Sequence, residues 1–341
     1  MTSPLVSDSA ATLAEKLEAF LCGVWTCPVR VVDVAASSAG ARRRNVAFEA
    51  LAEGRPPSGL VVTIVPEGAG GLNTVSSEAA MRTLARRRGV PVPEVVAVSE
   101  DAGILGGPFF ISQRVDGETV PRRVLRLVAG NRNGEQIAGQ LGAALARLHS
   151  ISPDLAPPGL IDPGPRPPAE AALGDLSTAI FDLGLADRPA LALGMKWLER
   201  HLPKTDSAAS IVHTDVRNGN LIVGPDGLRA ILDWEGSRKL GDPMEDLAWP
   251  ALRMWRFRSD ELEVGGFSSL PPLVDGYNQA GGSFDVERFE WWKVLGTLRW
   301  AIGLYGQASA HLNGTFPSIV MAASGRRVPE MEWDLLMLIR P

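Results

Sequence analysis

The segment HTDVRNGN, residues 213–220, is a polar stretch between the aliphatic runs IV and LIV. The residues that follow, NLIVGPDGLRAILD, contain two apolar runs joined by GPDG, a turn sequence that predicts a β-hairpin. Folding this hairpin places Asp233 opposite the region of Asn218 to Asn220. The chain must therefore adopt a fold that brings an amide oxygen and a carboxylate together from separate segments.

The polar segment has the spacing H-x-D-x-x-x-x-N, formed by His213, Asp215 and Asn220. A loop of this kind, followed by a hairpin that ends in Asp, is the arrangement of a kinase catalytic loop and its metal-binding strand. Mg²⁺ prefers oxygen ligands and takes one or two from protein when phosphates complete its coordination. The alternative is a polar turn with capping side chains and a hydrogen-bonded, buried His213. The hairpin with Asp233 favours the catalytic interpretation.

The region upstream predicts a small sheet. Runs with strand character occur at 29–37, 45–51 and 59–65, and again in PEVVAVS and PFFISQRV. A helix over 76–88, closed by Gly and Pro, separates the first three strands from the last two. An amphipathic helix is expected before them, because Leu13 and Leu17 share one helical face. This order predicts a five-stranded lobe.

From about residue 118 the sequence favours helices. Helical periodicity is found over 135–151, 190–202, 243–257 and 286–310, and the proline-rich stretch 152–171 predicts an ordered loop. The last helix carries Trp and aliphatic residues at helical spacing, which are more typical of a packed core than of a ligand cage.

Composition excludes several classes of protein. The net charge of −5 and pI near 5.5 argue against a general nucleic-acid binder. The two cysteines, Cys22 and Cys27, are read as reduced thiols of a cytoplasmic protein. No apolar run approaches the roughly 20 residues that span a bilayer, so no membrane partner is expected. The oligomeric state is left open.

The motifs HTDVRNGN and ILDWE resemble those of the aminoglycoside phosphotransferase and choline kinase superfamily. Further similarity lies in GVPVPEV, PFFISQRVDG, LARLHSI and GDPMEDLAW. The ending GRRVPEMEWDLL is similar to a subgroup that includes kinase-like domains fused to acyl-CoA dehydrogenases. The family usually has Gly where this chain has Thr214.

The resemblance implies an α+β, bilobal protein-kinase-like fold. Its N-lobe would be a five-stranded antiparallel sheet with one helix, over residues 1–115, and its mainly helical C-lobe would span 116–341. The implied activity is Mg²⁺-assisted transfer of the γ-phosphate of ATP to a hydroxyl of a small molecule.

The resemblance also assigns roles to individual residues. Asp215 is the catalytic base or orients the acceptor hydroxyl, and Asn220 and Asp233 are the Mg²⁺ ligands. Arg217 either neutralises the transferring phosphoryl group or forms a surface ion pair.

Other residues are given supporting roles by the same resemblance. His213 is a hydrogen-bonded scaffold residue, and Asp242 and Asp246 brace the catalytic loop or the start of a helix. Main-chain groups of Gln113 and Val115 in the hinge are the expected adenine contacts.

The upper lobe departs from the family pattern. Glu78 matches the helix Glu that pairs with a basic residue on the third strand, but Thr63 stands at that basic position. The phosphate-loop region offers Arg42, Arg43 and Arg44 instead. We expect Arg43 or Arg44 to reach inward and replace the missing cation, unless the triplet is simply solvated at a loop tip.

The acceptor is less constrained. The basic, aromatic segment RMWRFR favours a hydroxylated molecule of apolar or anionic character, although DELE follows it. An aminoglycoside or choline-like acceptor is the alternative among enzymes. A nucleotide-binding pseudokinase is the alternative from another class, and the residue Thr63 argues for it.

Overall fold

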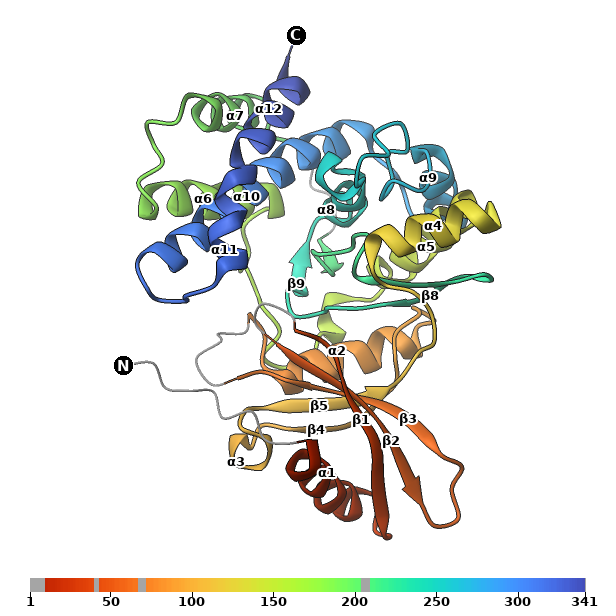
Figure 1. The fold of residues 1–341 in the computed structure, drawn as a ribbon. Helices are drawn as coiled ribbons and strands as arrows, with labels where there is room; N and C mark the ends of the chain where they lie inside the picture. The colour runs from red at the N-terminus through yellow and green to blue at the C-terminus, as the bar shows by residue number, and fades with distance from the viewer. Residues whose placement is uncertain (1–9, 40–42, 67–71, 204–208, 341) are drawn as a thin grey trace.

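The structure, a computed structural model, describes residues 10–39, 43–66, 72–203 and 209–340. It has an α+β, bilobal protein-kinase-like fold, with a five-stranded sheet in one lobe and a mainly helical second lobe (Figure 1). The fold class predicted from the sequence is therefore confirmed. The lobe boundary at residues 115 and 116 stays a prediction. Arg42 lies outside the described residues.

The sheet of the first lobe is antiparallel throughout, with strand order β1-β2-β3-β5-β4. Its strands and helices are α1 (Ala10–Trp25), β1 (Val29–Ala39), β2 (Arg44–Ala52), β3 (Ser58–Ile64), α2 (Val75–Arg87), β4 (Val95–Ser99), α3 (Ala102–Leu105) and β5 (Phe109–Gln113). The helix predicted over 76–88 and all five predicted strands are present.

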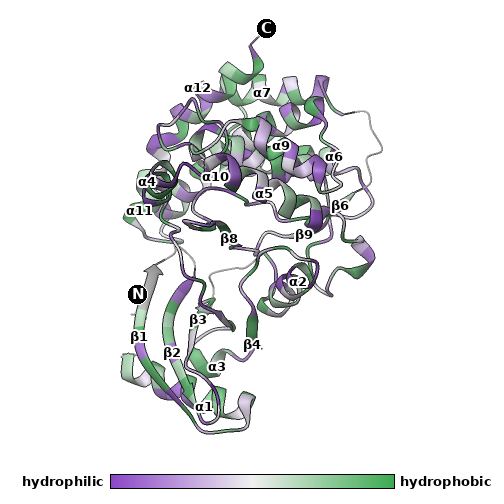
Figure 2. Cartoon of the chain, turned by 90° about the vertical axis from the view of Figure 1, so that its right-hand side faces the viewer, coloured by the Kyte–Doolittle hydropathy of each residue, from purple (hydrophilic) through white to green (hydrophobic). Residues whose placement is uncertain are grey.

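The two faces of this sheet have different roles, because side chains alternate along each strand. One face carries Val46, Phe48 and Val62, which pack in one apolar cluster with α1 and α3. The opposite face carries Thr63 and Phe110 and receives α2. Helix α2 lies between the sheet and the helical lobe in both side views (Figures 1 and 2). The helix that bears Glu78 is thus positioned at the junction of the lobes.

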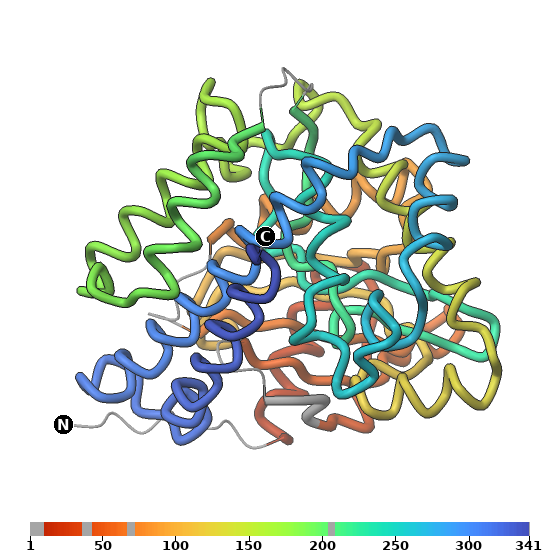
Figure 3. Tube along the Cα trace, turned by 90° about the horizontal axis from the view of Figure 1, so that it is seen from above, coloured from red at the N-terminus to blue at the C-terminus, as the bar shows by residue number. Residues whose placement is uncertain are grey.

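The second lobe packs its helices around one apolar core. Its elements are α4 (Pro121–Asn131), α5 (Gly134–His149), α6 (Pro168–Asp182), α7 (Pro189–Arg200), β6 (Ser210–Val212), β7 (Leu221–Gly224), β8 (Gly227–Ile231), β9 (Arg238–Gly241), α8 (Pro243–Ala248), α9 (Leu270–Gln279), α10 (Val286–Leu312), α11 (Ile319–Ser324) and α12 (Val328–Ile339). Seen from above, the green α6 and α7 lie on one side and the yellow α4 on the other (Figure 3). Trp291, Leu295 and Leu298 of α10 are core residues.

The chain passes from β5 into the helical lobe through a short connection that is attached to the hairpin β7–β8. Glu118 and Val223 exchange backbone hydrogen bonds of 2.8 and 3.0 Å. Gly117, at φ +149°, has no room for a side chain, because a Cβ would lie 2.8 Å from the Val223 carbonyl oxygen. The connection and the hairpin that bears Asp233 therefore form one unit.

The structure differs from the sequence expectation in two places. The helix predicted over 243–257 ends at Ala248 and continues as two 3₁₀ turns, because Pro250 lacks the N–H that an α-helical turn needs. The stretch 152–171 is not all loop, since a 3₁₀ turn forms at 153–155 and α6 begins at Pro168. Among the described residues, no helix combines the length and the apolar character needed to span a membrane.

Helices α5 and α9 cross at glycines, and this gives the first prediction. A Cβ at Gly142 would lie 2.1 Å from the carbonyl oxygen of Leu273, whereas at Gly303 of α10 no atom lies within 4 Å. We expect Gly142→Ala to lower the free energy of unfolding by about 1–3 kcal/mol through overpacking. The control Gly303→Ala should raise it by up to about 1 kcal/mol, because Ala favours helix. Urea denaturation followed by circular dichroism measures both, and equal effects would contradict the packing argument.

Candidate active site

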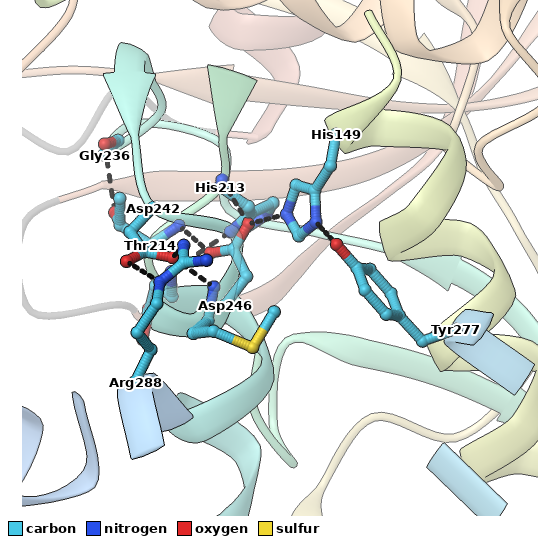
Figure 4. Close-up of polar contacts among 10 residues, drawn as sticks. His149, His213, Thr214, Gly236, Asp242, Asp246, Tyr277 and Arg288 are labelled. Atoms are coloured by element: carbon cyan, nitrogen blue, oxygen red, sulfur yellow. Dashed lines mark hydrogen bonds and ion pairs between the residues drawn. The ribbon is translucent and has the colours of Figure 1, made fainter. Parts of the chain in front are cut away.

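The polar segment 213–220 is held in place by the carboxylate of Asp246, on α8. Asp246 is fully buried and accepts hydrogen bonds from the backbone N–H of His213 at 2.7 Å and of Thr214 at 2.6 Å (Figure 4). His149 of α5 donates to the same carboxylate at 3.0 Å, and its other ring nitrogen contacts the Tyr277 hydroxyl at 3.1 Å. Burial acts to raise the pKa of Asp246, but these hydrogen bonds and the two histidines lower it below its ordinary value.

Thr214 adopts a backbone conformation that favours glycine. Its φ is +74°, a strained value for a β-branched residue. The grip of Asp246 on its N–H and a 3.0 Å hydrogen bond from its hydroxyl to the Gly236 carbonyl hold it there (Figure 4). This accounts for the glycine usual in the family and shows how a threonine is accommodated.

His213 behaves as a scaffold residue. It is fully buried, its Nε2 donates to the Leu232 carbonyl at 3.0 Å, and its Nδ1 accepts from the N–H of Asp215 at 3.2 Å. Asp242, by contrast, caps α8 by accepting from the N–H of Met244 and pairs with Arg288 of α10. Both residues fix the backbone around the segment.

The carboxylate of Asp215 accepts hydrogen bonds from three side chains. Its Oδ1 accepts from Arg217 Nε at 3.0 Å and from Trp249 Nε1 at 2.8 Å, and its Oδ2 accepts from Asn220 Nδ2 at 2.7 Å. The side chain keeps 29% of its surface exposed, so it remains accessible. Burial raises the pKa of Asp215 above its ordinary value, Arg217 counteracts this, and the nearby Asp233 raises it further.

The hairpin brings Asp233 to the segment as the sequence pattern predicts. Leu221 pairs with Ile231, and the N–H of Leu232 donates to the Asn220 carbonyl at 2.8 Å, so Asp233 follows directly. Asp233 has φ +63°, a left-handed conformation that Asp tolerates. Asn220 uses its amide nitrogen on Asp215, which leaves its side-chain oxygen for another partner.

This donor set fits Mg²⁺. An amide oxygen and a carboxylate are hard oxygen ligands, and phosphates and water supply the rest of the coordination in nucleotide sites. No cluster of three or more His, Cys, Asp or Glu side chains that could hold a metal alone is found in the part of the chain that the structure describes. The repulsion between Asp215 and Asp233 is a further reason for a divalent cation to bind here.

On the opposite side of the lobe junction, Arg43 reaches inward from the position directly before β2. Its Nη1 contacts Glu78 Oε2 at 2.7 Å, and its Nε lies 2.8 Å from Oε2 of Glu235, which is two residues after Asp233. Burial acts to lower the pKa of Arg43, but the carboxylates outweigh it and raise that pKa. Arg43 thus joins α2 to the segment that follows strand β8 and Asp233.

The other residues predicted to bind the nucleotide are Arg44, Gln113 and Val115. Arg44 begins β2 opposite Ile64, and its side chain has no ion pair among the described residues. The N–H of Gln113 is engaged by the Glu94 carbonyl at 2.8 Å, so its own carbonyl is the group that could accept from adenine. Val115 follows two residues later, outside the β5 strand.

Two tryptophans lie at the site, and the sequence left open whether they line an apolar pocket or belong to the core. Trp249 donates to Asp215, and the Trp255 ring lies 4.5 Å from the guanidinium of Arg217. Trp300 of α10 packs on Trp255 with ring centroids 4.9 Å apart. The segment WPALRMW, directly after the α8 helix, carried this signal, but its aromatic residues could not be told from core by spacing alone.

Comparisons with known proteins identify the family of the chain. Residues 33–292 match the model of the Phosphotransferase enzyme family. The chain is 28% identical over 271 residues to Acyl-CoA dehydrogenase family member 10 of Mus musculus, covering 74% of this chain and 25% of that protein. The chain spans about a quarter of the length of the curated relatives it matches.

Two solved structures share the fold. A candidate aminoglycoside phosphotransferase from Ralstonia eutropha has a TM-score of 0.69 at 21% identity, over 95% of this chain and 97% of that one. An aminoglycoside phosphotransferase in complex with ADP and hygromycin B has a TM-score of 0.58 at 17% identity, over 94% and 98%. With the family model matched over most of the chain, we conclude that this protein belongs to the phosphotransferase enzyme family.

Proposed function

We propose that this chain transfers the γ-phosphate of ATP to a hydroxyl group of a small molecule. The observation that carries the proposal is the convergence of Asp215, Asn220 and Asp233 at the lobe junction, with Asn220 hydrogen-bonded to Asp215 at 2.7 Å. Its solved structural neighbour with ADP supports a nucleotide as the donor.

In this proposal Asn220 and Asp233 hold the metal. When bound, Mg²⁺ would neutralise charge on the phosphate oxygens. Asp215 orients the acceptor hydroxyl and accepts its proton, a role that suits a carboxylate with a raised pKa. Arg217, whose guanidinium is fixed between Asp215 and Trp255, would stabilise charge on the transferring group.

The nucleotide would lie between the sheet and the catalytic loop. The Gln113 carbonyl and the Val115 N–H would meet the adenine edge. Arg43 would take the place of the strand cation beside Glu78 and Glu235, and Arg44 would add positive charge at the entrance. Thr63 remains the one feature that favours a regulatory pseudokinase, and measured turnover of ATP separates the two functions.

For the acceptor we propose a hydroxylated compound with an apolar or anionic part. A cavity of about 210 Å³ lies on the segment that carries Trp255, and its lining combines three cations with apolar side chains: Arg253, Arg256, Lys293, Leu252, Trp333 and Met337. Each of these cations is paired with a carboxylate: Arg253 with Asp260 and Asp334, Arg256 with Glu263, and Lys293 with Glu263 and Glu290. The apolar side chains of the lining therefore carry the preference for an acceptor with an apolar part. Hydroxylated carboxylic acids and their thioesters meet this description, and the name of the mouse relative is compatible with an acyl compound.

Loss of the Asp215 carboxylate tests the reaction itself. We expect Asp215→Asn to slow Mg²⁺-dependent ATP turnover by about 10²- to 10⁴-fold, the range for a lost general base, with ADP affinity little changed. The control Asp182→Asn, at an exposed position on α6, should leave turnover unchanged. Wild-type protein that binds Mg²⁺ and ATP but gives no phosphate release or transfer would favour the pseudokinase.

The pH dependence follows from the charges around Asp215. Arg217 lowers the pKa of Asp215, so Arg217→Met should raise that pKa. A base is active only when deprotonated, and the acid limb of the rate profile should therefore move to higher pH in the variant. Initial rates of ATP turnover between about pH 5 and pH 9 measure this shift of the acid limb. A limb that stays in place, or moves to lower pH, would rule out Asp215 as the titrating base.

A panel of alcohols tests the acceptor class. With radiolabelled ATP, we expect label to pass to hydroxylated carboxylic acids or their thioesters in preference to kanamycin and choline. Arg256→Ala, which removes one cation from the cavity, should raise KM for an anionic acceptor more than for a neutral alcohol. Efficient phosphorylation of kanamycin would refute the proposed class while leaving the reaction type intact.

A further inference from the structure

Arg82 is a buried cation on α2, one helical turn after Glu78. The residue is only 5% exposed, and its guanidinium lies 4.5 Å from the centre of the Phe110 ring. Its Nε has no hydrogen-bond partner, and no carboxylate lies within ion-pair distance of it, in the part of the chain that the structure describes. The charge is therefore held in place without a bonded counter-ion.

The Arg82 guanidinium lies over the face of the sheet that carries Thr63, the position where a strand cation is missing. Thr63 of β3 pairs with Phe110 of β5 on one side and with Asn45 of β2 on the other, so these side chains share one face of the sheet. The Thr63 hydroxyl donates to Asn45 Oδ1 at 2.8 Å, and this short side chain ends there. A basic side chain at position 63 would reach over the same face as the Phe110 ring, where the Arg82 guanidinium lies.

The energetics of Arg82 point to an anion from outside the chain. Burial lowers the pKa of Arg82 to about 10, Glu78 counteracts this only in part, and the neighbouring Arg43 adds repulsion. Glu78 is already bonded to Arg43 at 2.7 Å. A buried charge without a bonded partner is costly, and a phosphate group would compensate it with charge-assisted hydrogen bonds.

We propose that Arg82 binds the phosphate chain of the nucleotide and so supplies the phosphate contact of the missing strand cation, whose ion pair with Glu78 is made by Arg43. This inference rests on the proposed function and gives Arg43 and Arg82 separate roles. Arg43 joins Glu78 to Glu235 across the lobe junction. Arg82 has no such ion pair and lies near enough to Asp233 to interact with its charge, so it is available for phosphates bound beside Asp233.

Nucleotide binding, measured without turnover, tests the assignment. Isothermal titration calorimetry with Mg²⁺ compares ADP with adenosine for the wild type, Arg82→Met and Arg86→Met. Arg86 is the matched control, an exposed arginine on the same helix that pairs with Glu94. We expect Arg82→Met to weaken ADP binding by about 10- to 100-fold, the range for a lost hydrogen bond to a charged group. Adenosine affinity should not change, and Arg86→Met should bind both as the wild type does.

Two further readouts separate binding from folding. Without ligand, Arg82→Met should melt at the same temperature as the wild type or higher, because an unpartnered buried charge is removed. Adding Thr63→Lys to Arg82→Met should restore most of the lost ADP affinity, since it returns a cation to the same face of the sheet.

The outcomes are distinguishable. ADP affinity unchanged in Arg82→Met overturns the assignment of Arg82 but not the proposed function. Equal losses for ADP and adenosine also overturn it, because they indicate a structural role. A wild type that binds no Mg²⁺–ADP overturns the proposed function together with this inference.

Discussion

The carboxylate of Asp246 is the interaction on which the candidate site depends. It accepts the backbone N–H groups of His213 and Thr214 and so keeps Thr214 at φ +74°. A strained residue of this kind costs about 1–3 kcal/mol, which hydrogen bonds to a buried carboxylate can offset. Because Asp215 follows directly, the direction of its side chain is set by this contact. The network of His149, Asp246 and Tyr277 in Figure 4 therefore helps to position Asp215, the proposed base.

The charges at the lobe junction are arranged in two groups. Asp215, Asn220 and Asp233 form an oxygen-rich group on the helical lobe, and Arg43 and Arg82 form a cationic group facing it from the sheet and α2. Glu235, two residues after Asp233 on the helical lobe, forms an ion pair with Arg43, and this pair links the two groups across the junction. A metal–triphosphate is a ligand that satisfies both groups at once.

How far the sequence predicts the site depends on how local each contact is. The hairpin follows from a tight turn, and it forms as the sequence indicates, with the N–H of Leu232 bonded to the Asn220 carbonyl directly before Asp233. The inward reach of an arginine from 43–44 was an expectation drawn from Thr63, and Arg43 does contact Glu78. Arg82 was not identified, because helical spacing puts it on the face of Glu78 without revealing that it lacks a partner. The hydrogen bond from Trp249 to Asp215 was not predicted for a related reason, since a tryptophan of a pocket and a tryptophan of the core have the same spacing.

The central claim is that side chains from the catalytic loop and the hairpin meet around a metal bound to a triphosphate. Its most direct test is a crystal structure of the protein with Mg²⁺ and a non-hydrolysable ATP analogue. The account predicts a metal coordinated by the Asn220 side-chain oxygen and the Asp233 carboxylate, with the terminal phosphate directed at Asp215. Density that places the nucleotide elsewhere, or a metal held by neither Asn220 nor Asp233, would contradict it.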